Sequence, residues 1–171
     1  RPGLPLVTGT AADFIPARRT LKSLRDAARS CRGCRLWMVG SQTVFGEGKA
    51  AAKIMLVGEQ PGDAEDREGH PFVGPAGRLL DEALGEAGID RSDVYITNAV
   101  KHFKWERSEK SKRRIHKKPN AGEITACRPW LEAEIRVIKP RVIICLGSTA
   151  AQAVIGPKFK VSLQRGTFVE S

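Results

Sequence analysis

Three short apolar runs constrain the fold of this chain more than any other feature of its sequence. They cover residues 53–57, 94–100 and 142–146, and each is followed by glycine or by polar residues. Two segments between them, 75–87 and 120–138, carry apolar residues at helical spacing. Strands that alternate with helices predict an α/β fold: a three-layer sandwich with a mainly parallel central sheet flanked by helices. In such folds the functional site lies at the carboxyl ends of the strands.

The composition is that of one folded domain. Of the 171 residues, 41% are hydrophobic and 28% are charged, and no internal repeat marks a second domain. Residues 1–19 are expected to form a tail that packs little, and residues 20–171 to form the domain, with Thr20 capping a short helix through Arg29. No apolar run is long enough for a membrane span or a signal peptide, so we expect a cytoplasmic protein with no membrane partner.

Basic residues gather in one segment. The net charge is +10, and residues 101–118 hold nine lysines and arginines against two glutamates, a local balance of +7. Evenly spread lysines are usually a solvated surface, whereas a concentrated block favours a polyanionic partner. We therefore expect a long basic loop that meets a polyanion.

Cys31 and Cys34 form a Cys-x-x-Cys pair, the spacing that lets two thiolates reach one metal centre. Four cysteines in a cytosolic protein favour metal ligation over disulfides, but the pair alone leaves zinc, an iron–sulfur cluster and redox chemistry open. Cys145 lies within an apolar run and is expected to be a buried core thiol. Cys127, after the basic segment, is the better third ligand, and His102 is the candidate fourth.

A second group of chemically suggestive residues follows the first apolar run. The turn 58–62 (GEQPG) places backbone N–H groups, Glu59 and Gln60 at a strand's carboxyl end, where small residues let a ligand approach closely. Alone, this turn is equally compatible with a tight surface loop. The downstream loop 71–77 (PFVGPAG) holds Phe72 within a rigid backbone, which suits a platform for a flat base.

Taken in order, these motifs resemble those of the iron–sulfur uracil-DNA glycosylases. The resemblance covers roughly residues 20–170 and rests on Cys-x-x-Cys at 31–34, VFGEG at 44–48, VGEQPGD at 57–63, PFVGPAG at 71–77, ITNAVK at 96–101 and LG at 146–147. The insertion KRRIH at 112–116 resembles the UdgX branch, a family-4-like group. Its members bind uracil-DNA and become covalently joined to it through the histidine of that loop.

The resemblance implies a [4Fe–4S] cluster with Cys31, Cys34 and Cys127 as ligands. Other members carry cysteine at the position of His102, so this histidine is expected to be a nitrogen ligand, which can raise a cluster's potential. The family also has a His-Pro-Ser segment that contributes to the uracil pocket. No histidine of this chain is followed by Pro-Ser, so the C-terminal part of the family's domain is expected to be missing here.

The resemblance also assigns roles at the pocket. Cleavage of an N-glycosidic bond makes the sugar C1′ cationic, so Glu59 would face C1′ and His116 would attack it. Phe72 would stack on the base, and an amide would match the donors and acceptors of its edge. The residues expected to bind uracil are Gln60, Asp63, Phe72 and Asn98. Those expected to bind DNA phosphates are Arg113, Arg114, Lys117 and Lys118, with Trp105 stacking on a base.

Three functions are compatible with these residues. The first is a monomeric, nucleoid-associated bacterial protein that recognises uracil in DNA, preferably single-stranded, excises it and stays covalently linked to the sugar through His116. The second is a multiple-turnover uracil-DNA glycosylase on the same fold. The third is a non-catalytic, metal-stabilised nucleic-acid-binding module, for which the basic segment and the Cys-x-x-Cys pair would suffice.

Overall fold

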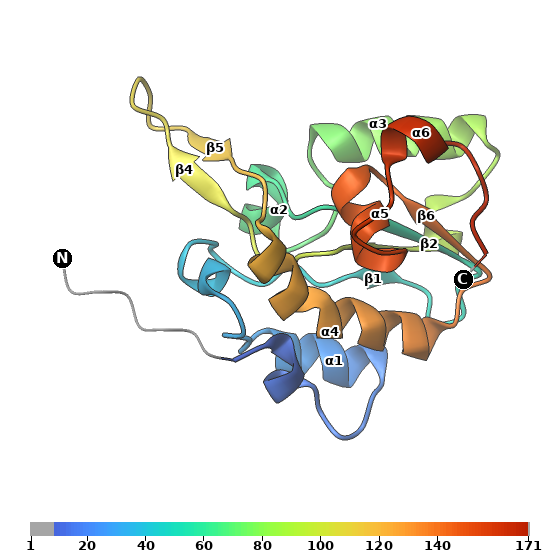
Figure 1. Cartoon of the computed structure of the whole chain (residues 1–171), viewed down its shortest axis with the longest axis horizontal. Helices are drawn as coiled ribbons and strands as arrows, with labels where there is room; N and C mark the ends of the chain where they lie inside the picture. Colours follow the sequence, from blue (N-terminus) through green and yellow to red (C-terminus); the bar gives the residue numbers. More distant parts are fainter. Residues whose placement is uncertain (1–8, 171) are drawn as a thin grey trace.

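The computed structural model describes residues 9–170 and contains a four-stranded sheet between helices (Figure 1). The strands lie in the order β1 (Glu47–Gly48), β3 (Val94–Asn98), β2 (Ile54–Gly58) and β6 (Val142–Cys145). β2 pairs in parallel with both β3 and β6, whereas the short β1 runs antiparallel to β3. The three predicted apolar runs therefore form the parallel part of the sheet.

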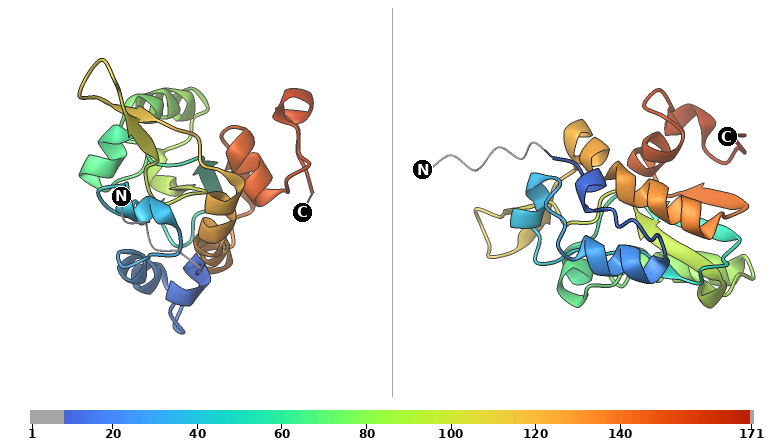
Figure 2. Two further views of the ribbon diagram at one scale, coloured as in Figure 1. Left: turned by 60° about the vertical axis from the view of Figure 1, so that its left-hand side comes forward. Right: turned by 90° about the horizontal axis from the view of Figure 1, so that it is seen from below.

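Helices cover both faces of this sheet. They are α1 (Leu21–Ala28), α2 (Asp63–Glu68), α3 (Pro75–Glu86), α4 (Ala121–Ile138), α5 (Ser148–Val154) and α6 (Val161–Gln164). Leu56 and Ile96 pack under α3, whereas Met55 and Tyr95 on the other face meet α4 and α5. Figures 1 and 2 show α4 lying between the sheet and α1. The predicted three-layer α/β fold is confirmed.

Local sequence signals set the helix boundaries. The Thr20 hydroxyl caps α1, and Asn120 and Glu123 form a reciprocal capping box at the start of α4. α3 ends at Glu86, two residues before Gly88, whose φ of +68° is left-handed, and α4 ends at Ile138, with left-handed Lys139 as its C-cap. These predicted boundaries are confirmed. No helix among residues 9–170 is long and apolar enough to cross a membrane.

The segment 1–19 differs from its prediction. A short 3₁₀ helix, Ala11–Phe14, packs onto α4, and Ala11 is fully buried. A Cβ on Gly33 would lie 2.5 Å from the Ala11 backbone nitrogen, so this helix presses against the Cys-x-x-Cys loop. The expectation that this segment packs little is wrong for the 3₁₀ helix and Ile15, which pack against the core, whereas residues 17–19 are exposed. Residues 1–8 lie outside the described residues. The apolar residues of this segment are interspersed with proline, glycine and threonine, so no periodic pattern in the sequence predicts a packed helix.

The basic segment is not a simple loop. β4 (Trp105–Arg107) and β5 (Arg114–His116) pair antiparallel, with Trp105 opposite His116, and form a hairpin that projects from the sheet (Figure 1). Such short, charged strands lack the apolar alternation that predicts a strand from sequence. The hairpin places His116 at a defined position.

Candidate active site

A pocket of about 510 Å³ opens where β2 and β3 end at the carboxyl edge of the sheet. Its walls come from the turn after β2, from α2, from the loop 71–77 and from the hairpin. The predicted site residues that line it are Gln60, Asp63, Phe72, Asn98 and His116. Tertiary structure thus brings together side chains from four separate segments.

Asn98 ends β3 opposite Gly58 and contributes its side chain to this pocket. The residue is 2% exposed, and its Oδ1 has no hydrogen-bond partner among the described residues. A buried polar atom without a partner costs about 1–3 kcal/mol, so this oxygen is suited to accept a hydrogen bond from a ligand. A Cβ on Gly58 would lie 2.4 Å from this oxygen and 2.6 Å from Cζ of Phe72. Only glycine leaves room for both.

Phe72 has an unusual backbone conformation. Its φ of +55° is left-handed, which costs a residue other than glycine about 1–3 kcal/mol. Arg91 supports this conformation because its Nη2 donates to the carbonyl oxygens of Pro71 (3.1 Å) and Phe72 (3.0 Å). A Cβ on Gly77 would lie 1.9 Å from the Phe72 carbonyl oxygen, so only glycine fits at this position in the first turn of α3. These contacts hold the ring at the pocket wall.

Glu65 is a buried carboxylate that was not among the predicted site residues. One oxygen accepts from the N–H groups of Val73 (3.1 Å) and Gly74 (2.9 Å), and the other accepts from the N–H of Gly62 (3.0 Å). Glu65 therefore ties the loop 71–77 to the turn 58–62. The one sequence signal was its place three residues after the N-cap of α2, where an acid completes a capping box.

Glutamine at position 65 would turn one acceptor oxygen into an N–H₂ group facing a backbone N–H. Hydrogen bonds to a charged group contribute about 1.5–3 kcal/mol each, so we expect Glu65→Gln to lower the free energy of unfolding by about 2–3 kcal/mol. Glu68→Gln, at an exposed position of the same helix, is the matched control and should stay within about 0.5 kcal/mol of the parent. Urea unfolding measures both, and equal stabilities would contradict the bridging role of Glu65.

Glu59 and His116, the predicted catalytic residues, lie next to each other. Oε1 of Glu59 is 3.6 Å from Nε2 of His116, and the side chains are 27% and 51% exposed. The Thr149 hydroxyl donates to the other Glu59 oxygen and so fixes the carboxylate from α5. Thr149 was not predicted, and only the Leu-Gly motif before α5 marked its segment. The pair is accessible from outside the protein.

Gln60 lines the pocket, but its side-chain amide is bound to the hairpin. Oε1 accepts from the Lys104 N–H at 2.9 Å, and Nε2 donates to the carbonyl oxygens of Lys117 (2.9 Å) and Lys104 (3.3 Å). The amide thus spans the two chains at the base of the hairpin. Its predicted contact with uracil stays a prediction, because the side chain lines the pocket while both ends of its amide have partners within the protein. Gln60 positions the hairpin that carries His116.

Arg114 also departs from its predicted role as a phosphate contact. Nη1 donates to Asp66 Oδ2 at 2.5 Å, and Nε binds the carboxylate of Asp63, which was itself predicted to bind uracil. The Arg114 side chain is only 13% exposed and lies over the ring of Trp105, 5.4 Å from its centroid. The Trp105 indole N–H donates to the Val39 carbonyl at 2.8 Å, which fixes the orientation of the ring, and its stacking on a base stays a prediction. Arg114 therefore fastens β5 to α2.

The other basic residues divide between the interior and the surface. Lys101 is fully buried, and its Nζ donates to Glu134 at 2.6 Å, so it does not belong to the basic surface. Arg113, Lys117 and Lys118 are exposed, and Lys117 pairs with a glutamate of β4 at 2.9 Å. These three remain available to a polyanion.

Loss of the Arg114 anchor should free the hairpin. Its partly buried, charge-assisted bonds contribute about 1.5–3 kcal/mol, which corresponds to at least about tenfold more frequent opening. We expect Arg114→Gln to speed hydrogen exchange of residues 105–117 by that factor. Arg113→Gln removes the same charge from the exposed neighbouring position and should leave exchange unchanged. Equal exchange in the two variants would contradict the anchoring role.

Cys31, Cys34 and Cys127 are buried in one core cluster with Trp130. The Trp130 indole N–H donates to Cys31 Sγ at 3.2 Å, and the Lys101 backbone N–H donates to Cys127 Sγ at 3.3 Å. Burial raises the pKa of Cys34 and raises that of Cys127 to about 12, and the nearby sulfurs add to both effects. A bound metal would replace these thiol protons.

The three buried thiols are donors of the type that holds an iron–sulfur cluster. Within residues 9–170, no three His, Cys, Asp or Glu side chains converge on one metal ion. The ligands of an iron–sulfur cluster bind different iron atoms, so they need not converge on one point, and thiolates are its usual ligands. N–H donors to the sulfurs are a further feature that tunes such clusters.

His102, the predicted fourth ligand, is buried, and its Nε2 lies 2.9 Å from the Thr43 hydroxyl. That hydroxyl donates its only proton to the Ala28 carbonyl at 2.9 Å, so it accepts from His102 and Nε2 carries the ring proton. Burial lowers the pKa of His102 to about 4, so the ring is neutral at pH 7 with its lone pair on Nδ1. Cys145 packs against the core from β6 but is only partly buried, so its predicted full burial is wrong. His70 is exposed.

The sheet, with a ligand-sized pocket at the carboxyl edge of its parallel strands, defines an α/β protein of the kind that binds ligands at the strand ends. Residues 45–169 match the uracil DNA glycosylase superfamily, and the chain belongs to this superfamily. The superfamily predicted from the motifs is thereby confirmed.

Several relatives share this chain's sequence over most of its length. A type-4 uracil-DNA glycosylase of Sulfurisphaera tokodaii is 41% identical over 129 residues, which are 75% of this chain and 54% of the relative. One of Thermotoga maritima is 37% identical over 151 residues, covering 88% and 74%. A type-5 enzyme of Pyrobaculum aerophilum is 31% identical, covering 79% and 62%. The chain thus spans between about half and three quarters of the length of these relatives.

Proposed function

We propose that this protein recognises uracil in DNA, preferably single-stranded, excises it and becomes linked to the sugar C1′ through His116. The observation that carries the proposal is the 3.6 Å approach of Glu59 to His116 beside a pocket that holds an unpaired Asn98 oxygen. Superfamily membership and the names of the relatives support uracil excision. The covalent step, typical of the UdgX branch that the KRRIH insertion resembles, rests on the hairpin that carries His116.

Asn98 and Phe72 would select the base. The N3–H of uracil would donate to the unpaired Asn98 Oδ1, the Asn98 N–H₂ would donate to O4, and the Phe72 ring would stack on the base. In this orientation of the amide, cytosine would face acceptor with acceptor and donor with donor. A single strand is favoured because no base pair must be broken before the base enters the pocket.

Glu59 and His116 would divide the chemistry. The C1′–N1 bond breaks and its electron pair leaves on uracil, while Glu59 stabilises the positive charge at C1′. The lone pair of a neutral His116 ring nitrogen then bonds to C1′. The other ring nitrogen releases its proton, which neutralises the uracil anion. Attack by water in place of His116 would give an abasic site and a free enzyme.

The covalent step is tested on a denaturing gel with a uracil-containing single strand. We expect a heat-stable protein–DNA band that His116→Ser abolishes, because the serine side chain has no imidazole lone pair. Glu59→Gln should slow band formation by at least about 100-fold, the range typical of a lost charge-stabilising group. His70→Ser, a surface control, should keep the band. A band retained by His116→Ser would place the nucleophile elsewhere.

The second candidate is a multiple-turnover uracil-DNA glycosylase, as the names of the relatives suggest. The same gel separates the two, because abasic product in excess over enzyme without a shifted band would show turnover by water. Equal binding of uracil and thymine strands, with no product, would leave only a nucleic-acid-binding module.

We also propose a [4Fe–4S] cluster held by Cys31, Cys34, Cys127 and Nδ1 of His102. The buried thiols, the N–H donors to their sulfurs and the single available nitrogen of His102 support this set. A bound cluster would supply a covalent cross-link among the 31–34 loop, the end of the β3 segment and α4. It would thereby hold the segment that leads from Asn98 into the hairpin.

Metal analysis and absorption spectra test this ligand set. We expect about four iron atoms per chain and sulfide-to-iron absorption, both lost in Cys127→Ser. Cys145→Ser is the matched control and should keep the iron, because Cys145 lies in β6, apart from the other cysteines. His102→Ser should bleach faster than the parent in air. Colourless protein with stoichiometric zinc would contradict the assignment.

One chain supplies every group in the proposed reaction, which leads us to propose a monomer. A substrate within chromosomal DNA leads us to propose the bacterial nucleoid as its place of action.

A further inference from the structure

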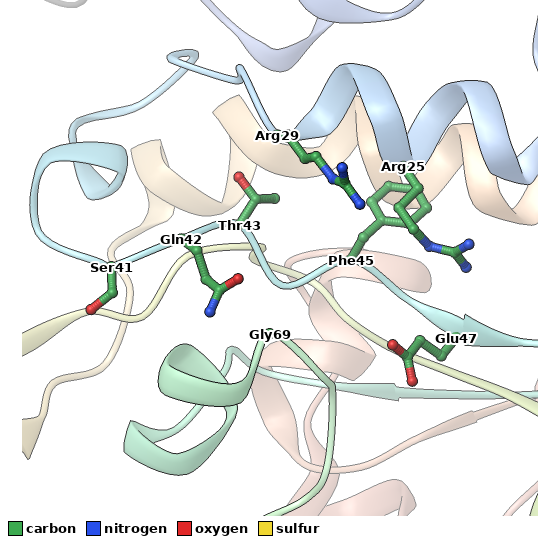
Figure 3. Close-up of a pocket in the computed structure, with 8 residues that line it drawn as sticks. All are labelled: Arg25, Arg29, Ser41, Gln42, Thr43, Phe45, Glu47 and Gly69. Carbon is green, nitrogen blue, oxygen red and sulfur yellow. The ribbon is translucent and has the colours of Figure 1, made fainter.

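A second pocket, of about 390 Å³, lies between α1 and the segment that leads into β1 (Figure 3). We call it the α1 pocket. Its lining residues are Arg25, Arg29, Ser41, Gln42, Thr43, Phe45, Glu47 and Gly69. None of them was assigned a role in the proposed excision. Most are polar, and two are cations.

The two arginines are one helical turn apart and therefore lie on the same side of α1. Nη2 of Arg25 donates to the Gly46 carbonyl at 3.2 Å, which holds its guanidinium at the pocket. Arg29 forms no ion pair with the described residues, and Figure 3 shows its guanidinium directed into the pocket. Guanidinium groups bind phosphate oxygens through paired N–H donors, so this arrangement suits a phosphate.

The α1 pocket lies at the opposite end of α2 from the proposed uracil pocket. Gly62 and Asp63, which begin α2, line the uracil pocket, whereas Gly69, which caps its end, lines the α1 pocket. A helix of six residues is about 9 Å long. A single strand with its uracil in the first pocket would cover a distance of that order in one or two nucleotides.

Of the four acids of α2, three have partners within the protein, whereas Glu68 is exposed. Asp63 and Asp66 bind Arg114, and Glu65 is buried with its oxygens bound by backbone N–H groups. Glu47, which lines the α1 pocket, is hydrogen-bonded to Nδ1 of His70, so the pocket holds two arginines against one carboxylate. Most of the negative charge of α2 is therefore already matched within the protein.

We propose that the α1 pocket binds a phosphate of the same DNA strand, one or two nucleotides from the uracil, through Arg25 and Arg29. This inference rests on the proposed function for the nature of the strand. Arg29 could also have a purely structural role, because a cation at the C-terminal end of α1 stabilises the helix dipole without any ligand. The two roles differ in their dependence on salt.

Binding of labelled 15-nucleotide strands, measured between 50 and 200 mM salt, tests the proposal. The strands carry thymine or an uncleavable 2′-fluoro-deoxyuridine, so that no adduct forms. We expect the salt slope of Arg25→Gln/Arg29→Gln to be smaller by about 0.7 than that of the parent, the value of one phosphate contact on a single strand. This difference in salt slope should appear with both the thymine and the uracil strand. It should vanish when the strand is shortened to the uracil on the side that reaches the α1 pocket, and persist when the strand is shortened on the other side.

Three controls keep the proposal open to contradiction. Arg136→Gln, which removes the same charge from an exposed position near the end of α4, should keep the parent slope. Arg29→Lys keeps a cation at the helix end and should retain most of the parent salt slope. Thermal unfolding checks that every variant folds. Inorganic phosphate at constant ionic strength is a further probe. Its binding at the α1 pocket without any change in the DNA slope would mean a free-anion site and overturn the proposal.

A salt slope in the Arg25→Gln/Arg29→Gln variant equal to that of the parent would also overturn the proposal. Failure of the proposed function looks different: the thymine and uracil strands would then bind equally, while the slope comparison would still report on the α1 pocket.

Discussion

The parallel pairing of β2 with β3 fixes the geometry on which the rest of the site depends. In this register Gly58 lies beside Asn98, and the pairing continues past the strands. The Ala99 N–H donates to the Gly58 carbonyl at 2.8 Å, and the Val100 N–H donates to the Glu59 carbonyl at 3.0 Å. The turn that carries Glu59 is thereby held against the strand end that carries Asn98. A one-residue slip would turn the Asn98 side chain to the other face of the sheet.

A buried ion pair supports this edge from behind. Lys101 Nζ donates to Glu134 and, at 2.7 Å, to the Asn98 carbonyl, while Glu134 also accepts from the hydroxyls of Tyr95 (2.8 Å) and Thr97 (2.9 Å). Burying two charges is tolerated only when every polar atom has a partner, as here. The Lys101 backbone N–H also donates to Cys127 Sγ. Lys101 thus links the pocket to the three buried cysteines. An iron–sulfur cluster bound by these cysteines would therefore stabilise the pocket without touching a substrate.

The hairpin owes its place to contacts at its base rather than to its own strands. Two three-residue strands are too short to be stable alone. The Gln60 amide binds both of its chains, and Arg114 binds α2, so His116 meets Glu59 instead of moving with the loop. The cations of this basic segment therefore have two roles. The buried or paired ones hold the hairpin in place, and exposed ones such as Arg113 remain available to a polyanion.

The sequence by itself determined the three parallel strands, the helix caps and most of the pocket lining. Apolar periodicity, the reciprocal pair Asn120 and Glu123 and the turn after β2 act over a few residues, so their outcome is readable locally. Asn98 was predicted because it ends a strand, and Phe72 because it lies in the loop 71–77, while the family resemblance implied the role of each at the pocket. These features needed no knowledge of distant partners.

Only the tertiary structure decided which partner each polar side chain takes. An arginine among lysines suits a phosphate and a carboxylate equally, and Arg114 found Asp66, 48 positions away. Lys101 turned inward because Glu134 lies behind it, and Glu65 took backbone N–H groups from two loops that meet only after folding. Residue type limits the bonds that a side chain can form, but the partner depends on which segments the fold brings within about 3 Å of it.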